Sequence, residues 1–584
     1  MNTKIPESSL NDAERKVLNA FLEHEPAVPF ADDSPVTDKN IRGDFLRDLF
    51  LGEYDEKADY RGTCIVGAVI DDVFNMEFCE TKFPVRFHNC TFAQKIKLRQ
   101  LTCPELYFCD CTLKNGVNAV GAKVAGSVSL RGEFNAMGEV NLVGAEVGGQ
   151  LVCAGGNFQN KKGKAINAQD IKVAGGVFLN ADNSASNGIN KFNAEGEVRL
   201  VGAEVGGLAC AGGRFQNKEG LALNAQSIKV AGGVFLHDGF NAVGEVNLVG
   251  AEVGQLDCPG GSFQNEEGRA LNAQSIKVAA EVFLCDGFNA EGEVFFANAT
   301  IGGSIVLEKC KLTHLSLAGT NVSGEFQDDA QVYKNDQGDD IELDIDGFRY
   351  QRLNTTKERI ENRLEWVGSM SRGNKFYPQP YEQLMKVYRE MGHMNWARRV
   401  GFELEKKRHK QLRLNRDHKR FVVLGWVWWM WYWILRATIG YGYKPFRTLW
   451  WFPFAIVVGL PLFSGVLCPQ KWTSPSVVMS TLGNGITEQS ECERWRMLPS
   501  DVGALVSPDW RDGEVPPDGY PKFIPLFYAI EVALPVLALG QTSNWQPESL
   551  GLKWIQGIFI IIGAVALAVP ASYRTGFLNP RWWD

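Results

Sequence analysis

The stretch FNAMGEVNLVGAEVGG, which begins at Phe134, decides the fold of this 584-residue chain because it recurs along the sequence. It returns as FNAEGEVRLVGAEVGG from Phe192, FNAVGEVNLVGAEVG from Phe240 and FNAEGEVFFANATIGG from Phe288. The last two steps are 48 residues each, and the first is 58 because residues 180–191 are an insertion. Within each unit ALNAQSIKVAGGVFL echoes LVGAEVGGQLVC, so one unit holds two coils of about 24 residues. Periods of this length predict a solenoid.

The strand pattern indicates which solenoid this is. Over residues 59–330 short β-branched and apolar stretches alternate with Gly, Asn and Asp turns, and no helix-length segment intervenes. We therefore expect a right-handed parallel β-helix whose coils stack strand on strand around small interior residues. Repeated amides are expected to form ladders between the coils: Asn167, Asn224, Asn272, Gln159, Gln216 and Gln264. A binding groove for a protein or small molecule on the flat faces is a further interpretation.

Helical patterns flank the repeats. Residues 1–58 are expected to form a helical N-terminal cap, because Asn11 and Glu14 form a capping-box pattern and a second apolar pattern ends at Gly52. Residues 331–420 are expected to form the exit coil and a helical neck, with a helix pair at 381–391 and 395–410 that is broken at Gly392. We thus expect a mainly β solenoid between two helical ends.

The neck ends in a basic run directly before an apolar block. Its eight cations are Lys406, Lys407, Arg408, Lys410, Arg413, Arg416, Lys419 and Arg420. A basic run is also typical of nucleic-acid binders, but the net charge of −8 gives no global support for that partner. Its position beside apolar segments favours binding to anionic lipids of the inner leaflet.

Residues 421–584 predict an α-helical membrane domain. Residues 421–435 contain five Trp and are short for a span, so they either lie in the interface or cross the bilayer. Residues 449–468 and 554–573 are each twenty uncharged residues, which matches the thickness of a bilayer core. Residues 523–547 are broken by Pro and Gly and predict a re-entrant segment, and 469–522 form the loop between.

The distribution of basic residues predicts the orientation. The loop 469–522 holds five Lys or Arg against eight Asp or Glu, whereas the basic run precedes the first full span. We therefore expect the N-terminal rod and the C-terminus in the cytoplasm and the loop outside, in a multi-pass membrane protein. The absence of a signal-peptide pattern agrees with a cytoplasmic rod. Cys468 and Cys492 then lie on the oxidising side, either as a disulfide or as free thiols.

Three segments carry a family resemblance. ATIGYGYKPFRTLWW (437–451), YEQLMKVYREMGHMNWARRVGFELEKKRHK (381–410) and FIPLFYAIEVALPVLALGQTSNWQP (523–547) resemble bacterial pentapeptide-repeat proteins with a potassium-channel-like domain. The resemblance covers roughly residues 40–580, although the five-residue units are imperfect and the central coils are longer than those of the family. It implies an inner-membrane homo-oligomer, a tetramer in the channel case, with one re-entrant loop per chain.

The candidate pore residues depart from that family. A potassium filter uses a TVGYG-like run, whereas residues 536–542 read VLALGQT and only Gly540 corresponds. The pore candidates are Glu531, Leu539, Gly540 and Gln541. Glu531 is an ionisable group in an apolar segment, for which solvation at the outer interface is the alternative. In the last helix Gly563 is a candidate gating hinge or a packing glycine.

The functional hypotheses follow from this organisation. The first is a channel- or pore-like oligomer whose cytoplasmic β-helix senses a partner, and the second is a membrane-anchored scaffold that does not conduct. A triggered membrane-disrupting defence effector and an enzyme are the remaining alternatives. No nucleophile–base pair, metal-ligand spacing or cofactor loop occurs in the sequence, so we expect no enzyme, no cofactor and no metal site. Cys109 and Cys111 are expected to be small core residues.

Overall fold

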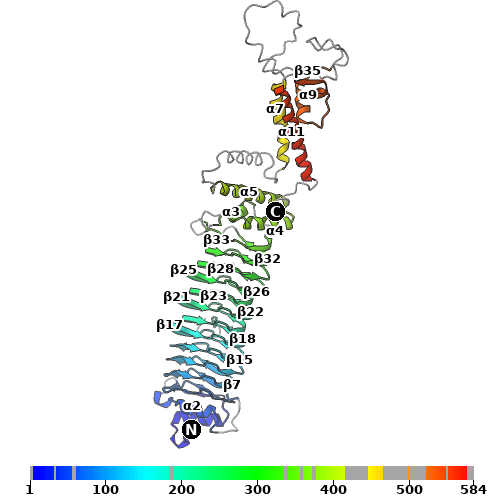
Figure 1. Ribbon diagram of the computed structural model, residues 1–584. Helices are drawn as coiled ribbons and strands as arrows, with labels where there is room; N and C mark the ends of the chain where they lie inside the picture. The colour runs from blue at the N-terminus through cyan, green and yellow to red at the C-terminus, as the bar shows by residue number, and fades with distance from the viewer. Residues whose placement is uncertain are drawn as a thin grey trace, which may run out of the picture. The chain divides into compact units, whose positions relative to one another are not determined.

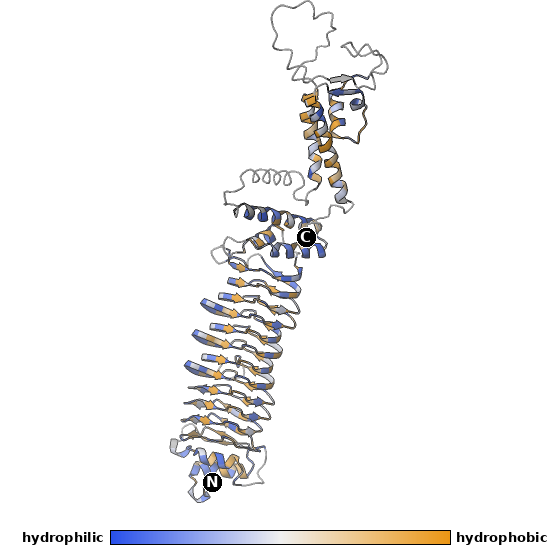
Figure 2. Ribbon diagram, viewed as in Figure 1, coloured by the Kyte–Doolittle hydropathy of each residue, from blue (hydrophilic) through white to orange (hydrophobic). Residues whose placement is uncertain are grey.

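The computed structural model describes residues 4–31, 35–54, 61–182, 190–329, 332–334, 340–354, 360–370, 376–414, 445–463, 497–499, 521–547 and 550–574. The chain divides into two compact units, residues 1–397 and 398–584. The first unit is a parallel β-solenoid of about 12 turns with helices at both of its ends (Figure 1). The second contains two long apolar helices. The predicted parallel solenoid is therefore confirmed. Hydrophilic and hydrophobic residues alternate along its strands (Figure 2).

Two parallel sheets form the solenoid in the described residues. The 19-stranded sheet holds β1 (Ala27–Pro29), β2 (Cys64–Val66), β4 (Val85–His88), β7 (Thr102–Cys103), β8 (Leu106–Cys109), β11 (Lys123–Val124), β12 (Val128–Ser129), β15 (Glu146–Val147), β16 (Leu151–Val152), β18 (Lys172–Phe178), β20 (Glu204–Ala209), β22 (Lys229–Phe235), β24 (Glu252–Asp257), β26 (Lys277–Val278), β27 (Val282–Phe283), β29 (Thr300–Ile301), β30 (Ile305–Leu307), β32 (Asn321–Asp328) and β34 (Arg349–Leu353). The 15-stranded sheet holds β3 (Val69–Ile70), β5 (Thr91–Phe92), β6 (Ile96–Lys97), β9 (Thr112–Leu113), β10 (Val117–Asn118), β13 (Asn135–Ala136), β14 (Val140–Asn141), β17 (Asn157–Asn167), β19 (Asn193–Arg199), β21 (Arg214–Asn224), β23 (Asn241–Asn247), β25 (Ser262–Asn272), β28 (Asn289–Phe295), β31 (Lys311–Ser316) and β33 (Glu342–Asp344).

The register explains the 48-residue repeat. Val205 pairs with Val230 and Val230 with Val253, which are steps of 25 and 23 residues between consecutive coils. The early coils have four short strands per turn, whereas β17 pairs with both β13 and β14, and β18 with both β15 and β16. Strands on adjacent sides thus merge in the central coils. This merging accounts for the longer coils that depart from a five-residue pattern.

A stack of phenylalanine rings fills the interior. Its members are fully buried and consecutive ring centroids lie 5.0 to 5.4 Å apart: Phe134, Phe158, Phe192, Phe215, Phe240, Phe263 and Phe288. The sequence analysis expected small interior residues, so this stack of large rings is a correction to it. Every second ring comes from the FNA motif of the repeat. The other rings come from the FQN motif of the alternate coils. Each coil therefore contributes one ring, and the stack ties neighbouring coils together.

Helices α1 (Asp12–Leu22) and α2 (Gly43–Phe50), with the short η1 (Glu7–Ser9) and η2 (Val36–Asp38), lie at the first coils. Asn11 accepts from the Glu14 backbone N–H and the Glu14 carboxylate accepts from that of Asn11, so the predicted capping box is confirmed. The ring of Phe50 packs on Phe74 and Phe87 of the first coils. These contacts give the N-terminal coils a covering of apolar side chains.

Helices α3 (Ile360–Gly368), α4 (Gln379–Glu390) and α5 (Met394–Leu414) follow the last coils. Arg363 is 1% exposed, and its Nη1 donates to Asp328 Oδ2 over 2.7 Å while its Nη2 donates to the other oxygen. Gln383 of α4 donates to the Tyr350 carbonyl of β34 over 2.6 Å. Gly392, with φ of 82°, separates α4 from α5 as predicted. A buried ion pair thus attaches α3 to the solenoid, and a hydrogen bond from a side-chain amide attaches α4.

Candidate functional site

The second unit contains two helical segments that are long and apolar enough to cross a membrane. One is Phe446–Phe463, formed by η3 (Pro445–Trp450) and α7 (Trp451–Phe463), and the other is Leu550–Ser572 of α11 (Leu550–Arg574). Only 28% and 17% of their residues are buried, and large side chains such as Val457 and Ile561 are exposed. Exposed apolar helices of this length match the thickness of a bilayer core. Figure 2 shows both as orange ribbons.

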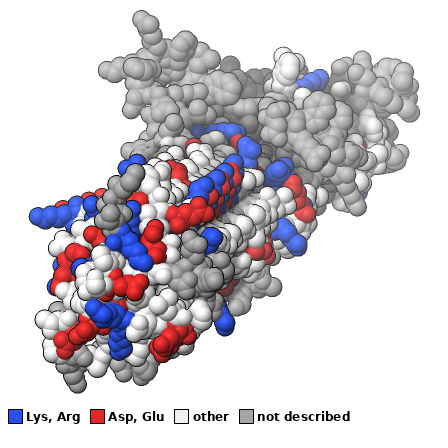
Figure 3. Space-filling model, turned by 90° about the horizontal axis from the view of Figure 1, so that it is seen from below, with Lys and Arg blue, Asp and Glu red and all other residues white. Residues whose placement is uncertain are grey.

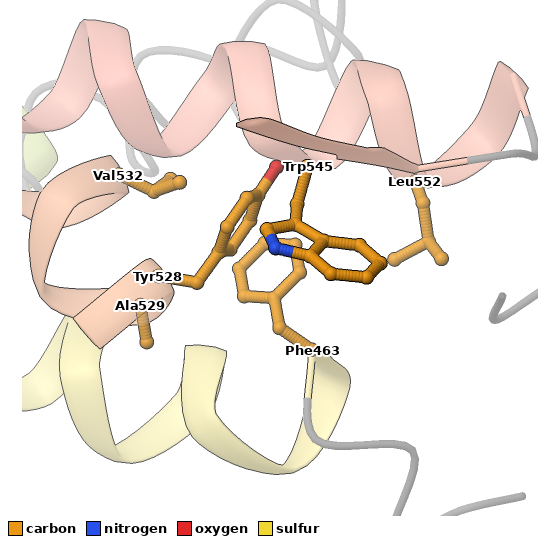
Figure 4. Packing of buried hydrophobic residues seen from close by; sticks show 6 residues of the cluster. All are labelled: Phe463, Tyr528, Ala529, Val532, Trp545 and Leu552. Carbon is orange, nitrogen blue, oxygen red and sulfur yellow. The ribbon is translucent and has the colours of Figure 1, made fainter. Parts of the chain in front are cut away.

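A short helix packs between these two segments. Helix α9 (Pro525–Ala533) contributes Tyr528, Ala529 and Val532 to a core with Phe463, Trp545 and Leu552 (Figure 4). Helices α7 and α9 lie close together at Gly459, where a Cβ would make an ordinary van der Waals contact of 3.6 Å with that of Ala529. The nine residues of α9 are about 14 Å long at 1.5 Å per residue, roughly half of a bilayer core. Helix α9 is therefore too short to span.

The chain returns after α9 to the place from which α9 started. The side chain of Gln541 accepts from Ile524 N over 2.9 Å and donates to the Lys522 carbonyl over 3.3 Å. The Trp545 indole donates to the Pro521 carbonyl over 3.1 Å. Residues 521–524 and 541–545 are thus tied together at one end of the segment. The re-entrant segment expected at residues 523–547 stays a prediction from the sequence, and the structure shows a short helix whose return closes on its own start.

Glu531 stabilises the return of the chain. Glu531 is buried, with 7% of its surface exposed. Its Oε2 accepts hydrogen bonds from Gln541 N over 2.7 Å and from Thr542 N over 2.9 Å. These N–H groups begin α10 (Gln541–Asn544), which is followed by β36 (Trp545–Pro547) paired antiparallel with β35 (Met497–Pro499). Gly540 precedes α10 with φ of 77°, a conformation that favours glycine. Glu531, Gly540 and Gln541 therefore shape the loop within one protomer.

The residues between α9 and Gly540 present apolar side chains. Val536 is 78% exposed, Leu537 43% and Leu539 44%. The Leu537 N–H donates to the Leu534 carbonyl over 2.9 Å, which makes a turn at the tip of the segment. Of the four pore candidates, Leu539 is thus the one with an exposed side chain. The sequence analysis compared residues 536–542 with a potassium filter, and of the exposed stretch 535–539 it named only Leu539 as a pore candidate.

Gly563 lies where α11 meets the end of α9. A Cβ on Gly563 would come within 2.1 Å of the Ala533 carbonyl oxygen, and α11 continues as one helix through this residue. The contacts of Gly563 support the packing role that was the alternative to a hinge. Gly563 is thirteen residues, about 20 Å of helix, from the start of α11. The tip of α9 therefore packs near the middle of α11.

The basic run is described only in part. Lys406 pairs with Glu403 over 3.0 Å and Arg408 with Glu405 over 3.0 Å, and Lys410 is exposed. Burial lowers the pKa of Lys407. The side chain of Arg413, the residues Arg416, Lys419 and Arg420, the segment 421–435, Cys468 and Cys492 lie outside the described residues. Glutamates thus compensate two of the cations that were expected to face lipid.

Side chains of the amide rows form hydrogen bonds between coils, as expected, and some of these bonds join two amides: Gln159 Nε2 donates to Asn135 Oδ1 over 3.4 Å, and Asn247 Nδ2 donates to Asn224 Oδ1 over 3.5 Å. Glutamates are the other partners. Asn224 Nδ2 donates to Glu197 over 2.8 Å and Asn272 Nδ2 to Glu245 over 2.8 Å, so the repeated Asn residues pair with Glu of the preceding coil. These glutamates belong to the GEV motif of the repeat. Only the stacking of one coil on the next shows that each of them accepts a hydrogen bond from an asparagine. Ordered polar pairs of this kind fix the register of the coils.

The cysteines of the solenoid behave as core residues. Cys109 and Cys111 are buried, as expected, and Cys109 Sγ lies 3.6 Å from Ser129 Oγ. Burial raises the pKa of Cys103 to about 12 and that of Cys64 to about 11. A thiol with a raised pKa stays protonated at neutral pH and is a poor nucleophile or metal ligand.

Comparison with known proteins gives no family: no family model, no curated protein and no solved structure matches this chain. The resemblance carried by residues 381–410, 437–451 and 523–547 therefore remains a prediction from the sequence. The structure establishes a β-solenoid of about 12 turns and two candidate membrane-spanning helices.

Proposed function

We propose that this chain is an integral membrane protein that forms a pore-like homo-oligomer and carries its solenoid as an interaction domain. The observation that carries the proposal is the geometry of the segment between the two apolar helices. Helix α9 is half the length of a span, and residues 522 and 524 are bonded to Gln541 at its return. A segment that enters and leaves on one side is tolerated at membrane depth where it is buried in protein or lines a cavity.

The exposed side of this segment supplies the second support. Residues 535–539 lie between the tip of α9 and Gly540, and their side chains are exposed in the protomer. Backbone carbonyls of such a stretch can face a common axis when copies of the chain surround it. In this proposal Glu531 and Gln541 hold the loop rather than line the pore, since both are engaged by backbone groups.

The placement of the solenoid follows from charge. In the proposal the basic run lies at the inner leaflet of a bacterial inner membrane, with the solenoid and the C-terminus in the cytoplasm. Anionic lipids and copies of the chain are the partners of the membrane unit, and a polypeptide or small molecule is the partner of the solenoid. No nucleic acid and no cofactor enter the proposal.

The test is ion flux through the purified chain in liposomes, combined with cysteine modification. Leu539→Cys places a thiol on the proposed pore lining, and a charged thiosulfonate reagent added outside should reduce its flux. Val565→Cys is the matched control, because Val565 is an apolar residue of α11 that is 53% exposed. Wild type treated with the same reagent corrects for Cys468 and Cys492.

The outcomes separate the proposal from its main alternative. Reduced flux in Leu539→Cys alone supports a pore lined by residues 535–539. Flux that is absent from folded oligomers in wild type, or equal loss in both variants, would refute it. The uniformly apolar side chains of residues 534–539 favour the alternative, a membrane-anchored scaffold that oligomerises without conduction. A scaffold would keep its oligomeric mass and show no flux.

A further inference from the structure

One row of outward-facing residues on the 19-stranded sheet differs from the rest of the solenoid surface. Successive coils pair these residues in register, and each is partly exposed between buried neighbours in its strand. The row, which we call the apolar row, consists of Val152, Phe178, Ala209, Phe235, Asp257, Phe283 and Val306. Ser129 precedes it and Gln327 follows it in the same register.

The neighbouring row on the same sheet shows what an ordinary solvent-facing position looks like. It alternates lysine and glutamate from coil to coil and is called the charged row: Lys123, Glu146, Lys172, Glu204, Lys229, Glu252 and Lys277. Lys277 pairs with Glu252 over 2.8 Å, and acidic and basic side chains lie next to each other along the solenoid in Figure 3. The two rows have seven members each and share six coils, so the apolar character belongs to one register of the sheet and not to the whole sheet.

Glycines make the surface beside the apolar row flat. A Cβ on Gly233 would lie 2.6 Å from the Phe235 ring, and one on Gly176 would lie 3.0 Å from the Phe178 ring. The rings therefore extend over the glycine backbone of their own strands. Seven coils at 4.8 Å spacing give a strip about 29 Å long. A flat apolar strip of this length is suited to an extended chain or a helix.

One carboxylate interrupts the strip. Asp257 lies in register between Phe235 and Phe283, and its partial burial raises the pKa of the carboxyl group. In the described part of the chain no side chain hydrogen-bonds or ion-pairs with Asp257. The nearby imidazole of His237 contacts Asp238 instead, with 2.8 Å between Nδ1 and Oδ2. A half-buried acid flanked by aromatic rings is suited to a cationic group, which gains an ion pair and ring contacts together.

We propose that the apolar row is the docking surface for a polypeptide partner that presents apolar side chains around one basic residue, which pairs with Asp257. A second copy is the poorer occupant, because two parallel copies that met through this row across a two-fold axis would set Asp257 against Asp257. The proposal rests on the interaction role given to the solenoid above and names the chemistry of its partner. Its test measures binding without ion flux, so either proposal can fail alone.

The experiment selects peptides from a displayed library of random sequences on the full chain in lipid nanodiscs. Parallel selections use Asp257→Asn, which removes a negative charge from the apolar row, and its control Glu252→Gln, which removes one from the charged row of the same strand, β24. Both variants are first checked for a folded solenoid by their circular dichroism spectra at the temperature of the selection. The readout is the enrichment of Lys or Arg flanked by apolar residues, followed by the affinity of the selected peptides and of their citrulline analogues.

We expect the basic motif on wild type and on Glu252→Gln and its loss on Asp257→Asn, with affinity lowered about tenfold or more by the missing ion pair. Phe235→Ser should weaken the same peptides. Three results would overturn the proposal: no basic motif on wild type, equal binding by Asp257→Asn, or a change in oligomeric mass of Phe235→Ser, which would show that a second copy occupies the row.

Discussion

The stack of buried rings predicts a sharp and local response to Phe215→Ala. Phe215 is fully buried, and its ring centroid lies 5.1 Å from that of Phe192 and 5.2 Å from that of Phe240. The variant removes one ring from the middle of the stack and leaves the outer surface unchanged. It tests whether the interior rings or the outer charges hold the coils together.

The magnitude follows from burial. Truncation of a fully buried phenylalanine costs about 3–5 kcal/mol, which includes the ring contacts on both sides and the cavity left behind. In a solenoid each coil contacts its two neighbours, so the loss should be concentrated in the coils that carry Phe192, Phe215 and Phe240. Amide exchange there should be faster by roughly 10²-fold or more, limited by the stability of the intact coils.

Hydrogen exchange measured by mass spectrometry on the full chain is the appropriate assay, because a chain of two units does not unfold in one step. Phe295→Ala is the matched control. Phe295 belongs to the same sheet but faces outward, where the guanidinium of Arg269 covers it at 3.8 Å from the ring centroid. Its truncation should cost about 1 kcal/mol or less because little apolar surface leaves the interior.

Two results would refute this reasoning. Equal exchange in Phe215→Ala and Phe295→Ala would mean that the ring stack does not determine the stability of the coils. Faster exchange across the whole solenoid in Phe215→Ala would mean that the coils unfold as one cooperative body rather than through nearest neighbours.

Three further predictions concern other parts of the chain. Arg363→Leu leaves the carboxylate of Asp328 buried without its guanidinium partner and should destabilise the last coils by about 3–5 kcal/mol. Amide hydrogen exchange of β32 measures this loss, and adding Asp328→Asn should restore part of it. The hydrogen-bonded ion pair with Lys277 lowers the pKa of Glu252. The stability that this pair contributes is therefore present above the ordinary carboxyl pKa and is lost as the pH falls through the lowered value. The difference in melting temperature between Glu252→Gln and wild type should vanish at acid pH and shrink in high salt. Gly563→Val should lower the thermal stability of the detergent-solubilised protein because the new side chain collides with the Ala533 carbonyl at the end of α9, whereas Gly551→Val, which has open space around it, should not.

Local patterns predicted the elements that depend on neighbouring residues. The two-coil unit, the capping box at Asn11 and the break at Gly392 were all visible, because strand alternation and helix ends are set within a few residues. The same holds for the two apolar helices, whose length and composition are properties of a continuous stretch.

Local patterns did not predict which side chains of neighbouring coils contact each other. The sequence singled out Asn224 and Asn272 as members of ladders between coils, but it did not predict that their amide groups donate to glutamates of the preceding coil. It showed the FNA motif, which carries four of the seven stacked rings, but it predicted small interior residues and no stack, since the alternate coil carries its ring in a different motif. Which residues meet depends on the register between coils about 23–25 residues apart, and that register changes where strands merge.

The sequence by itself determined that this chain is a repeat solenoid followed by apolar helices, because periodicity and hydropathy are local and additive. Only the tertiary structure decided what the special residues do. It directs the carboxylate of Glu531 to two backbone N–H groups, packs Gly563 against α9 and leaves Asp257 between two rings on the surface. These roles arise from distances between segments far apart in the chain, and no local pattern encodes such distances.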